Sequence, residues 1–131
     1  MIQGYNNRGL DINLSTGKVT DFEVKDTVFK KYLGGRGIGA YFLKKELSPT
    51  TEPLSPENLL VISTGGLSGS LAPAGGRFSV TFKSPLTGTI SSANSGGFWG
   101  NSFKRTGYDV CIIRGKASVP VYLYISENRV D

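Results

Sequence analysis

Two glycine-rich segments carry the residues of this sequence that are best suited to bind a ligand. Residues 75–77 (Gly-Gly-Arg) offer a guanidinium, and residues 94–97 (Asn-Ser-Gly-Gly) offer an amide and a run of backbone N–H groups. Glycine lets a backbone approach a ligand closely, and unpaired N–H groups at a helix start attract anions. A guanidinium matches two phosphate oxygens at once. The pattern predicts a phosphate-binding site formed by Gly76, Arg77, Asn94, Ser95, Gly96 and Gly97.

A purely structural interpretation of the same segments stays open. They also fit two glycine turns joined to strands, with Arg77 in a surface salt bridge. Phe98 and Trp99 follow directly and can begin a helix. Because Trp99 and Phe103 are four positions apart, they lie on one helix face, and we expect them to pack in the core instead of forming a stacking platform.

The lack of histidine excludes several kinds of chemistry. The chain has no His and one Cys, so Ser-His-Asp, Cys-His and His-based zinc sites are excluded. One cysteine cannot form an internal disulfide or a CxxC redox pair, or by itself hold an iron–sulfur cluster. Cys111 lies in an apolar run at residues 109–113, which predicts a small buried hydrophobic side chain.

Length and charge set broader limits. The 131 residues fit one domain or part of a larger one, and the net charge of +5 favours either an anionic partner or a solvated basic surface. The sequence contains no block of five like charges, so it has no basic tail of the kind that binds nucleic acid. No apolar run reaches the length of a membrane span, and the N-terminus lacks a signal-peptide core. We therefore expect a soluble cytoplasmic protein that does not associate with membranes.

The apolar periodicity predicts an α+β fold of mostly antiparallel sheets with about three interspersed helices. Strands are expected at residues 8–14, 19–24, 59–62, 78–82, 89–91, 110–114 and 119–125. Helices are expected from Asp26 or Thr27, either of which can cap the first helix, to residue 33, and then at residues 36–47 and 97–105. The first strand pair should form a hairpin.

Residues 35–40 match the G-x-G-x-x-A pattern of dinucleotide-binding loops. That pattern requires a preceding strand and a βαβ unit, whereas these residues follow a predicted helix. We therefore interpret the glycines as positions of tight packing between helices.

Several blocks of the sequence match one protein family in order and spacing. They are Arg-x-Leu-x-Ile-Asn-Leu-Ser-Thr-Gly at 8–17, Leu-Gly-Gly-Arg-Gly at 33–37, Pro-Leu-Ser-Pro-Glu-Asn at 53–58, Ala-Pro-x-Gly-Gly-Arg at 72–77, Lys-Ser-Pro-Leu-Thr-Gly at 83–88, Ala-Asn-Ser-Gly-Gly at 93–97 and Gly-Tyr-Asp at 107–109. Through these blocks the chain resembles the N-terminal domain of tungsten-containing aldehyde ferredoxin oxidoreductases over nearly its whole length.

The resemblance implies a function and a cofactor. Members of the family oxidise aldehydes to carboxylic acids and pass two electrons through a 4Fe–4S cluster to ferredoxin. Their metal is held by the dithiolenes of two pterins (tungstopterin), and the N-terminal domain forms the base under that cofactor. The resemblance implies that Arg77 and the Gly96 region contact phosphate or pterin polar atoms. It also implies that the backbone carbonyl of Asn94 reaches a magnesium ion that bridges the two pterin phosphates.

The family's cluster cysteines and substrate-channel residues belong to later domains, and nothing here matches them. We expect residues 1–131 to be an N-terminal domain that cradles tungstopterin (or molybdopterin), or most of that domain, truncated and inactive alone. Its partners would be the remaining domains, ferredoxin and a small aldehyde, with no nucleic acid. Unpaired sheet edges also predict a dimer or higher assembly of the isolated chain. The alternative is a free-standing module for anions or nucleic acid, which salt-dependent binding to an oligonucleotide would reveal.

Overall fold

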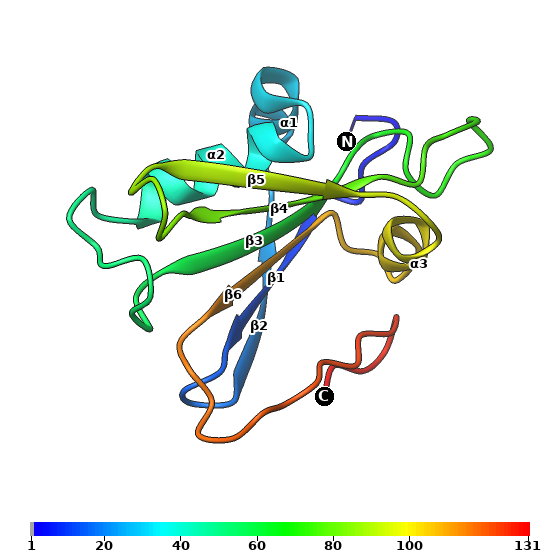
Figure 1. Cartoon of the computed structure of the whole chain (residues 1–131). Helices are drawn as coiled ribbons and strands as arrows, with labels where there is room; N and C mark the ends of the chain where they lie inside the picture. Colours follow the sequence, from blue (N-terminus) through cyan, green and yellow to red (C-terminus); the bar gives the residue numbers. More distant parts are fainter. Residues whose placement is uncertain (1) are drawn as a thin grey trace.

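A single six-stranded sheet forms the centre of the computed structural model, which describes residues 2–131 (Figure 1). The strands are β1 (Arg8–Asn13), β2 (Lys18–Glu23), β3 (Leu59–Thr64), β4 (Phe78–Lys83), β5 (Ile90–Ser95) and β6 (Val110–Arg114). Their order across the sheet is β2-β1-β6-β3-β4-β5, with β1 and β6 parallel and every other pair antiparallel. The predicted α+β class is confirmed.

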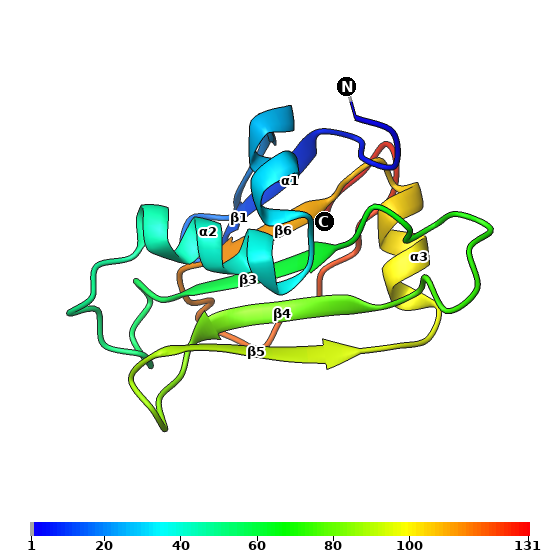
Figure 2. The same ribbon diagram turned by 90° about the horizontal axis from the view of Figure 1, so that it is seen from above.

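Three helices cover the two faces of this sheet unequally. The helices are α1 (Asp26–Tyr32), α2 (Arg36–Glu46) and α3 (Trp99–Arg105). α1 and α2 lie together on one face, and Figure 2 shows α2 above β3 and β4. α3 and the C-terminal segment lie on the other face (Figure 1). Within residues 2–131, no helix combines the length and the apolar character that crossing a membrane requires.

The alternation of side chains along the central strand β6 produces two separate cores. Val110 and Ile112 pack under α1 and α2 with Phe29, Ile38 and other apolar residues. Cys111 points to the opposite face and packs with Leu10, Ile12 and Phe103 of α3. Because successive strand residues point to opposite faces, the short strand β6 contributes side chains to both layers. The burial predicted for Cys111 is confirmed, since it is 0 % exposed.

Two sequence predictions about local structure are wrong. Residues 119–125 alternate like a strand but pair only through one bridge between Ile125 and Val130. Neither Asp26 nor Thr27 caps α1: the N-cap position is Lys25, which makes no side-chain capping hydrogen bond. Asp26 lies instead in the first turn, where its carboxylate accepts a hydrogen bond of 2.6 Å from the Asn7 amide. The predicted first hairpin and the helix at 36–47 are both present, the helix ending one residue early.

The glycines of the G-x-G-x-x-A match are packing positions. A Cβ atom at Gly37 would lie 2.2 Å from the Tyr32 carbonyl oxygen of α1. A Cβ atom at Gly39 would lie 2.2 Å from the Thr81 hydroxyl oxygen of β4. The first contact confirms tight helix-to-helix packing, and the second shows that the sheet also requires a glycine.

Candidate functional site

The pairing of β4 with β5 brings the two glycine-rich segments together. Phe78 pairs with Ser95 and Ser79 pairs with Asn94, so Arg77, which precedes β4, lies across from Gly96, which follows β5. Asn94 and Ser95 are the last two residues of β5, a strand that the sequence predicted only for residues 89–91. All six predicted site residues therefore gather at one corner of the sheet, and we call residues 75–77 and 94–97 the glycine corner.

In part of the glycine corner the backbones lie so close together that there is no room for a side chain. A Cβ atom at Gly76 would lie 2.6 Å from the Gly97 carbonyl oxygen. A Cβ atom at Gly100, in the first turn of α3, would lie 2.6 Å from the Gly76 carbonyl oxygen. Gly97 also has a φ of +91°, which side chains disfavour. Gly96, like Gly97, differs from Gly76 and Gly100, because a Cβ atom there would meet nothing within 4 Å. Its backbone therefore faces open space that a ligand can enter.

The polar groups at this corner suit an anion. Arg77 is exposed, and within residues 2–131 its guanidinium forms no ion pair, so the structural alternative of a surface salt bridge is not seen. Residues 58–108 contain no Asp or Glu, while the same stretch contains Arg77, Lys83, Lys104 and Arg105. This stretch contains the whole glycine corner, so no carboxylate from its own strands or loops opposes a negative charge there.

Asn94 is oriented by the strand beside it. The Ser79 hydroxyl, buried under α2, donates a hydrogen bond of 2.6 Å to the Asn94 side-chain oxygen. The start of α2 contacts the same serine, since a Cβ atom at Gly35 would lie 3.0 Å from the Ser79 hydroxyl oxygen. Ser63 in turn donates a hydrogen bond of 2.7 Å to the Gly35 carbonyl. The positive end of the α2 dipole therefore lies on the side of the corner opposite α3.

The segment at residues 65–76 forms the remaining wall. The Gly69 N–H donates to the Asn101 side-chain oxygen of α3 at 2.8 Å, and the Ser68 hydroxyl donates to the Arg77 carbonyl at 3.3 Å. Burial, and then the negative charge of Asp109, raise the pKa of Tyr5, whose ring lies against Gly66 of this wall. Gly100 and Asn101 were not among the sequence-predicted residues, although both directly follow Trp99 in the predicted helix.

The aromatic residues of α3 are mainly structural. The Trp99 ring stacks on Phe103 with centroids 5.1 Å apart and lies 4.5 Å from the Phe78 ring of β4. Phe103 is buried, whereas Trp99 is half-exposed and Phe98 is exposed. The expectation of core packing is confirmed for Phe103 and holds for one side of Trp99.

These features together describe an α+β domain with an exposed guanidinium, backbone N–H groups and open space at one corner of its sheet. Residues 2–131 contain no group of three or more His, Cys, Asp or Glu side chains that could hold a metal by themselves. Comparison with known proteins places the domain in a family. Residues 9–131 match the family described as aldehyde ferredoxin oxidoreductase, N-terminal domain. The chain belongs to this family.

Its relatives are longer proteins. The chain is 49 % identical over 124 residues to the tungsten-containing aldehyde ferredoxin oxidoreductase of Pyrococcus furiosus and 47 % identical over 124 residues to that of Thermococcus kodakarensis, covering 95 % of this chain and 20 % of each relative. It is 42 % identical over 130 residues to the aliphatic sulfonate oxidoreductase, WOR-like subunit, of Pyrococcus furiosus, covering 97 % of this chain and 20 % of that protein. The chain therefore spans about a fifth of these relatives.

A solved structure supports the same assignment. The chain superposes with a TM-score of 0.96 and 36 % identity on the active site complex BamBC of benzoyl coenzyme A reductase in complex with 1,5-dienoyl-CoA. The match covers 100 % of this chain and 20 % of that one. The resemblance noted from the sequence is therefore confirmed in both sequence and fold.

Proposed function

We propose that this chain is the tungstopterin-binding N-terminal domain of an oxidoreductase that oxidises aldehydes to carboxylic acids. The observation that carries the proposal is the meeting of exposed Arg77 with Asn94 and open Gly96 at one sheet corner. Residues 1–131 form this domain or most of it. The remaining domains supply the 4Fe–4S cluster and the substrate channel, and ferredoxin accepts the electrons in the cytoplasm.

The residues at the glycine corner fit such a group. A pterin phosphate needs a cation, N–H donors and space, and these are provided by Arg77, by the backbone of residues 96–97 and by the unfilled volume at Gly96. A magnesium ion bound with such phosphates would take oxygen ligands from the protein, and the backbone carbonyl of Asn94 would be a suitable one. The lack of a three-residue metal cluster in residues 2–131 is compatible with a metal held by its organic ligand.

The chain binds and orients, and the cofactor supplies the redox chemistry when it is bound. Arg77 and the N–H groups of the Gly96 region hold phosphate or pterin oxygens, with charge-assisted hydrogen bonds of about 1.5–3 kcal/mol each. The Asn94 backbone carbonyl is the proposed magnesium ligand, and Ser79 fixes the conformation of that residue. We assign no proton transfer to this domain, and because the cluster and the substrate channel would lie in the remaining domains, we expect the isolated chain to be inactive.

The first prediction concerns Arg77 in the full-length protein that carries this domain. Arg77→Ala should lower the tungsten content per polypeptide by about tenfold or more, because one charge-assisted contact is lost. The melting temperature of the unloaded protein should hardly change, since Arg77 is exposed and unpaired within residues 2–131.

Arg105→Ala is the matched control for this experiment. Arg105 is also exposed and lies at the opposite end of α3 from residues 96–98. Its removal lowers the net charge equally and should leave tungsten content unchanged. Equal tungsten content in the wild type and the Arg77 variant would refute the proposed function.

A further inference from the structure

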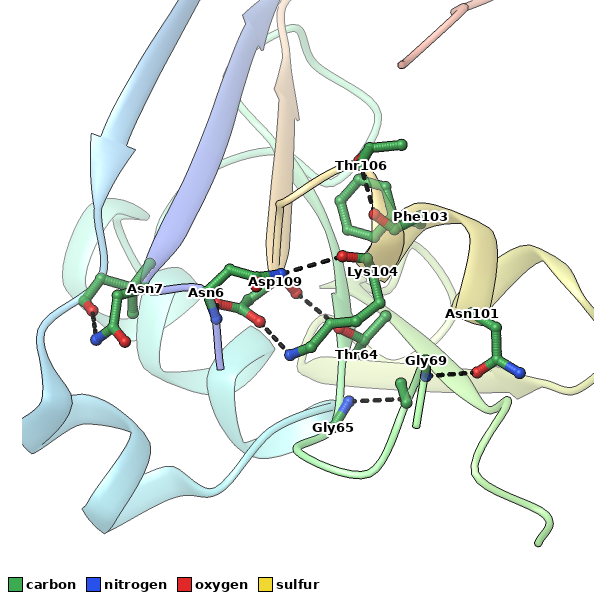
Figure 3. A network of polar contacts seen from close by, with 12 residues as sticks. Asn6, Asn7, Thr64, Gly65, Gly69, Asn101, Phe103, Lys104, Thr106 and Asp109 are labelled. Atoms are coloured by element: carbon green, nitrogen blue, oxygen red, sulfur yellow. Dashed lines mark hydrogen bonds and ion pairs between the residues drawn. The ribbon is translucent and has the colours of Figure 1, made fainter. Parts of the chain in front are cut away.

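A buried ion pair lies directly behind the wall of the glycine corner. The Lys104 ammonium of α3 pairs with the Asp109 carboxylate, and their side chains are 7 % and 0 % exposed. Figure 3 shows the pair between Asn6 and the chain that leaves β3 at Thr64. Neither residue reaches the exposed surface where Arg77 and Gly96 lie.

Asp109 joins three segments that are distant in sequence. Its Oδ2 atom accepts a hydrogen bond of 2.9 Å from the Asn6 N–H, and its backbone carbonyl accepts one of 3.0 Å from the Thr64 N–H. The Asn6 side-chain amide donates to the Lys104 carbonyl at 3.0 Å (Figure 3). The N-terminal segment, the end of β3 and the end of α3 are therefore held at one point.

Lys104 and Asn101 share one face of α3 and together hold the loop that begins at Gly65. The Lys104 stem leaves only 3.1 Å to a Cβ atom added at Gly69, and Asn101 accepts the Gly69 N–H at 2.8 Å. The Lys104 ammonium lies 4.9 Å from the centre of the Tyr5 ring. One turn earlier, the same helix contacts Gly76 through Gly100.

Stability alone does not account for a charged pair at this depth. Removing two charges from water costs free energy that their mutual attraction often does not offset. Apolar side chains of similar volume frequently stabilise the folded state at least equally well. A charged, hydrogen-bonded pair does supply a fixed geometry. Asp109 is also the first carboxylate after residues 58–108, which contain no Asp or Glu. Lys104 neutralises its charge behind the glycine corner.

We propose that Lys104, Asp109 and Asn101 are positioning residues for the glycine corner: they fix α3 against residues 64–69 and thereby set the spacing between Arg77 and residues 96–97. This inference rests on the proposed function, because the spacing matters only if a ligand bridges the two segments. None of the three residues touches the ligand.

The test uses the full-length protein with Lys104→Met and Asp109→Asn combined. This double variant keeps the net charge and an acceptor for the Asn6 N–H but removes the ion pair. Hydrogen exchange in residues 64–77 should become about tenfold faster, while exchange in β1 stays slow and reports an intact sheet. Tungsten content per polypeptide should fall about tenfold in parallel.

A second variant and a control make the result decisive even if the double variant folds poorly. Asn101→Ala touches no charge, and alanine favours the helix, so it should fold while loosening residues 64–77 and lowering tungsten content. The control is Arg114→Met with Asp11→Asn, which keeps the net charge and removes the ion pairs of Arg114 with Asp11 and Glu46 at the far end of β6. The control should change neither the hydrogen exchange of residues 64–77 nor the tungsten content per polypeptide.

Either readout unchanged in Asn101→Ala overturns the inference, as does an equal effect of the control pair. Arg77→Ala, measured in parallel, separates this outcome from failure of the proposed function. If Arg77→Ala loses tungsten while the positioning variants keep it, the proposed function stands and the inference fails. If Arg77→Ala keeps tungsten, the proposed function fails, and the inference that depends on it fails as well.

Discussion

Gly100 shows how a single missing side chain shapes the glycine corner. Alanine in place of a helical glycine usually stabilises a helix, by about 0.5–1 kcal/mol. At Gly100 the added carbon would lie 2.6 Å from a backbone oxygen of Gly76, and neither backbone can turn aside as a flexible side chain would. The usual sign of the substitution is therefore reversed here.

The second residue-scale prediction compares two glycines. Gly100→Ala should lower the free energy of unfolding by about 1–3 kcal/mol, as overpacked sites do. Gly96→Ala, where the new carbon meets nothing within 4 Å, should change it by less than about 0.5 kcal/mol. Denaturant titration of both variants checks this. A stabilised Gly100 variant would show that α3 and Gly76 are not in contact.

Cys111 yields a prediction about pH. Burial, and then the charge of Asp11, raise the pKa of this thiol to about 12. The folded protein therefore holds the thiol proton at a pH where the unfolded chain has released it. The resulting stabilisation is complete below the unfolded pKa and is lost as the pH rises toward the folded one.

Comparing wild type with Cys111→Ala isolates that contribution. Between about pH 8 and pH 10.5, the free energy of unfolding should decline more steeply in the wild type, because only the wild type has the Cys111 thiol. The raised pKa values of Tyr5 and Tyr108 affect both proteins equally and cancel in the comparison. The measurement is a denaturant midpoint at each pH. Parallel curves would mean that Cys111 is accessible to solvent in the folded state.

At the scale of elements, the sequence predicts best where one face must be buried. The strand β1 and the helix α2 follow from apolar periodicity, because their inward residues are needed for the core. β5 was predicted to end at Ser91, four residues early. As an edge strand it has no fully buried residue, and its polar composition does not reveal a strand.

Pairing between distant strands lies outside what periodicity can predict. Residues 119–125 alternate as a strand does, but alternation describes side chains and not hydrogen-bond partners. Only Ile125 forms a bridge, and Tyr122 and Tyr124 are exposed. For the same reason the meeting of Arg77 with Gly96 was a hypothesis from composition, and the register of β4 and β5 was needed to support it. The positioning role of Lys104 was missed because its partner Asp109 lies beyond the end of α3.

At the scale of the whole molecule, the two edges of the sheet differ. β2 carries Lys18, Asp21 and Glu23, which discourage a further strand from adding there. β5, at the other edge, has no charged residue and no proline between Ile90 and Ser95. The β5 edge is therefore open to pairing with a second copy.

The last prediction is that the isolated chain self-associates through β5. Ala93→Lys should shift the chain toward the monomer, because it places a charge in the middle of that edge. Val19→Lys, on β2, is the matched control and should have little effect. Light scattering at high concentration measures the assembly state, and a wild-type monomer at every concentration would contradict the expectation.

The place of β6 has a consequence for how this domain is made. Although β6 is the last of the six strands within residues 2–131, it lies between β1 and β3 and in the sheet joins the first hairpin to the three-stranded unit β3–β4–β5. During synthesis, the two halves can form early but cannot join until Val110–Arg114 has left the ribosome. Because this closure brings together segments from opposite ends of the chain, it is a slow kind of step, and the nascent polypeptide exposes both halves to chaperones until then.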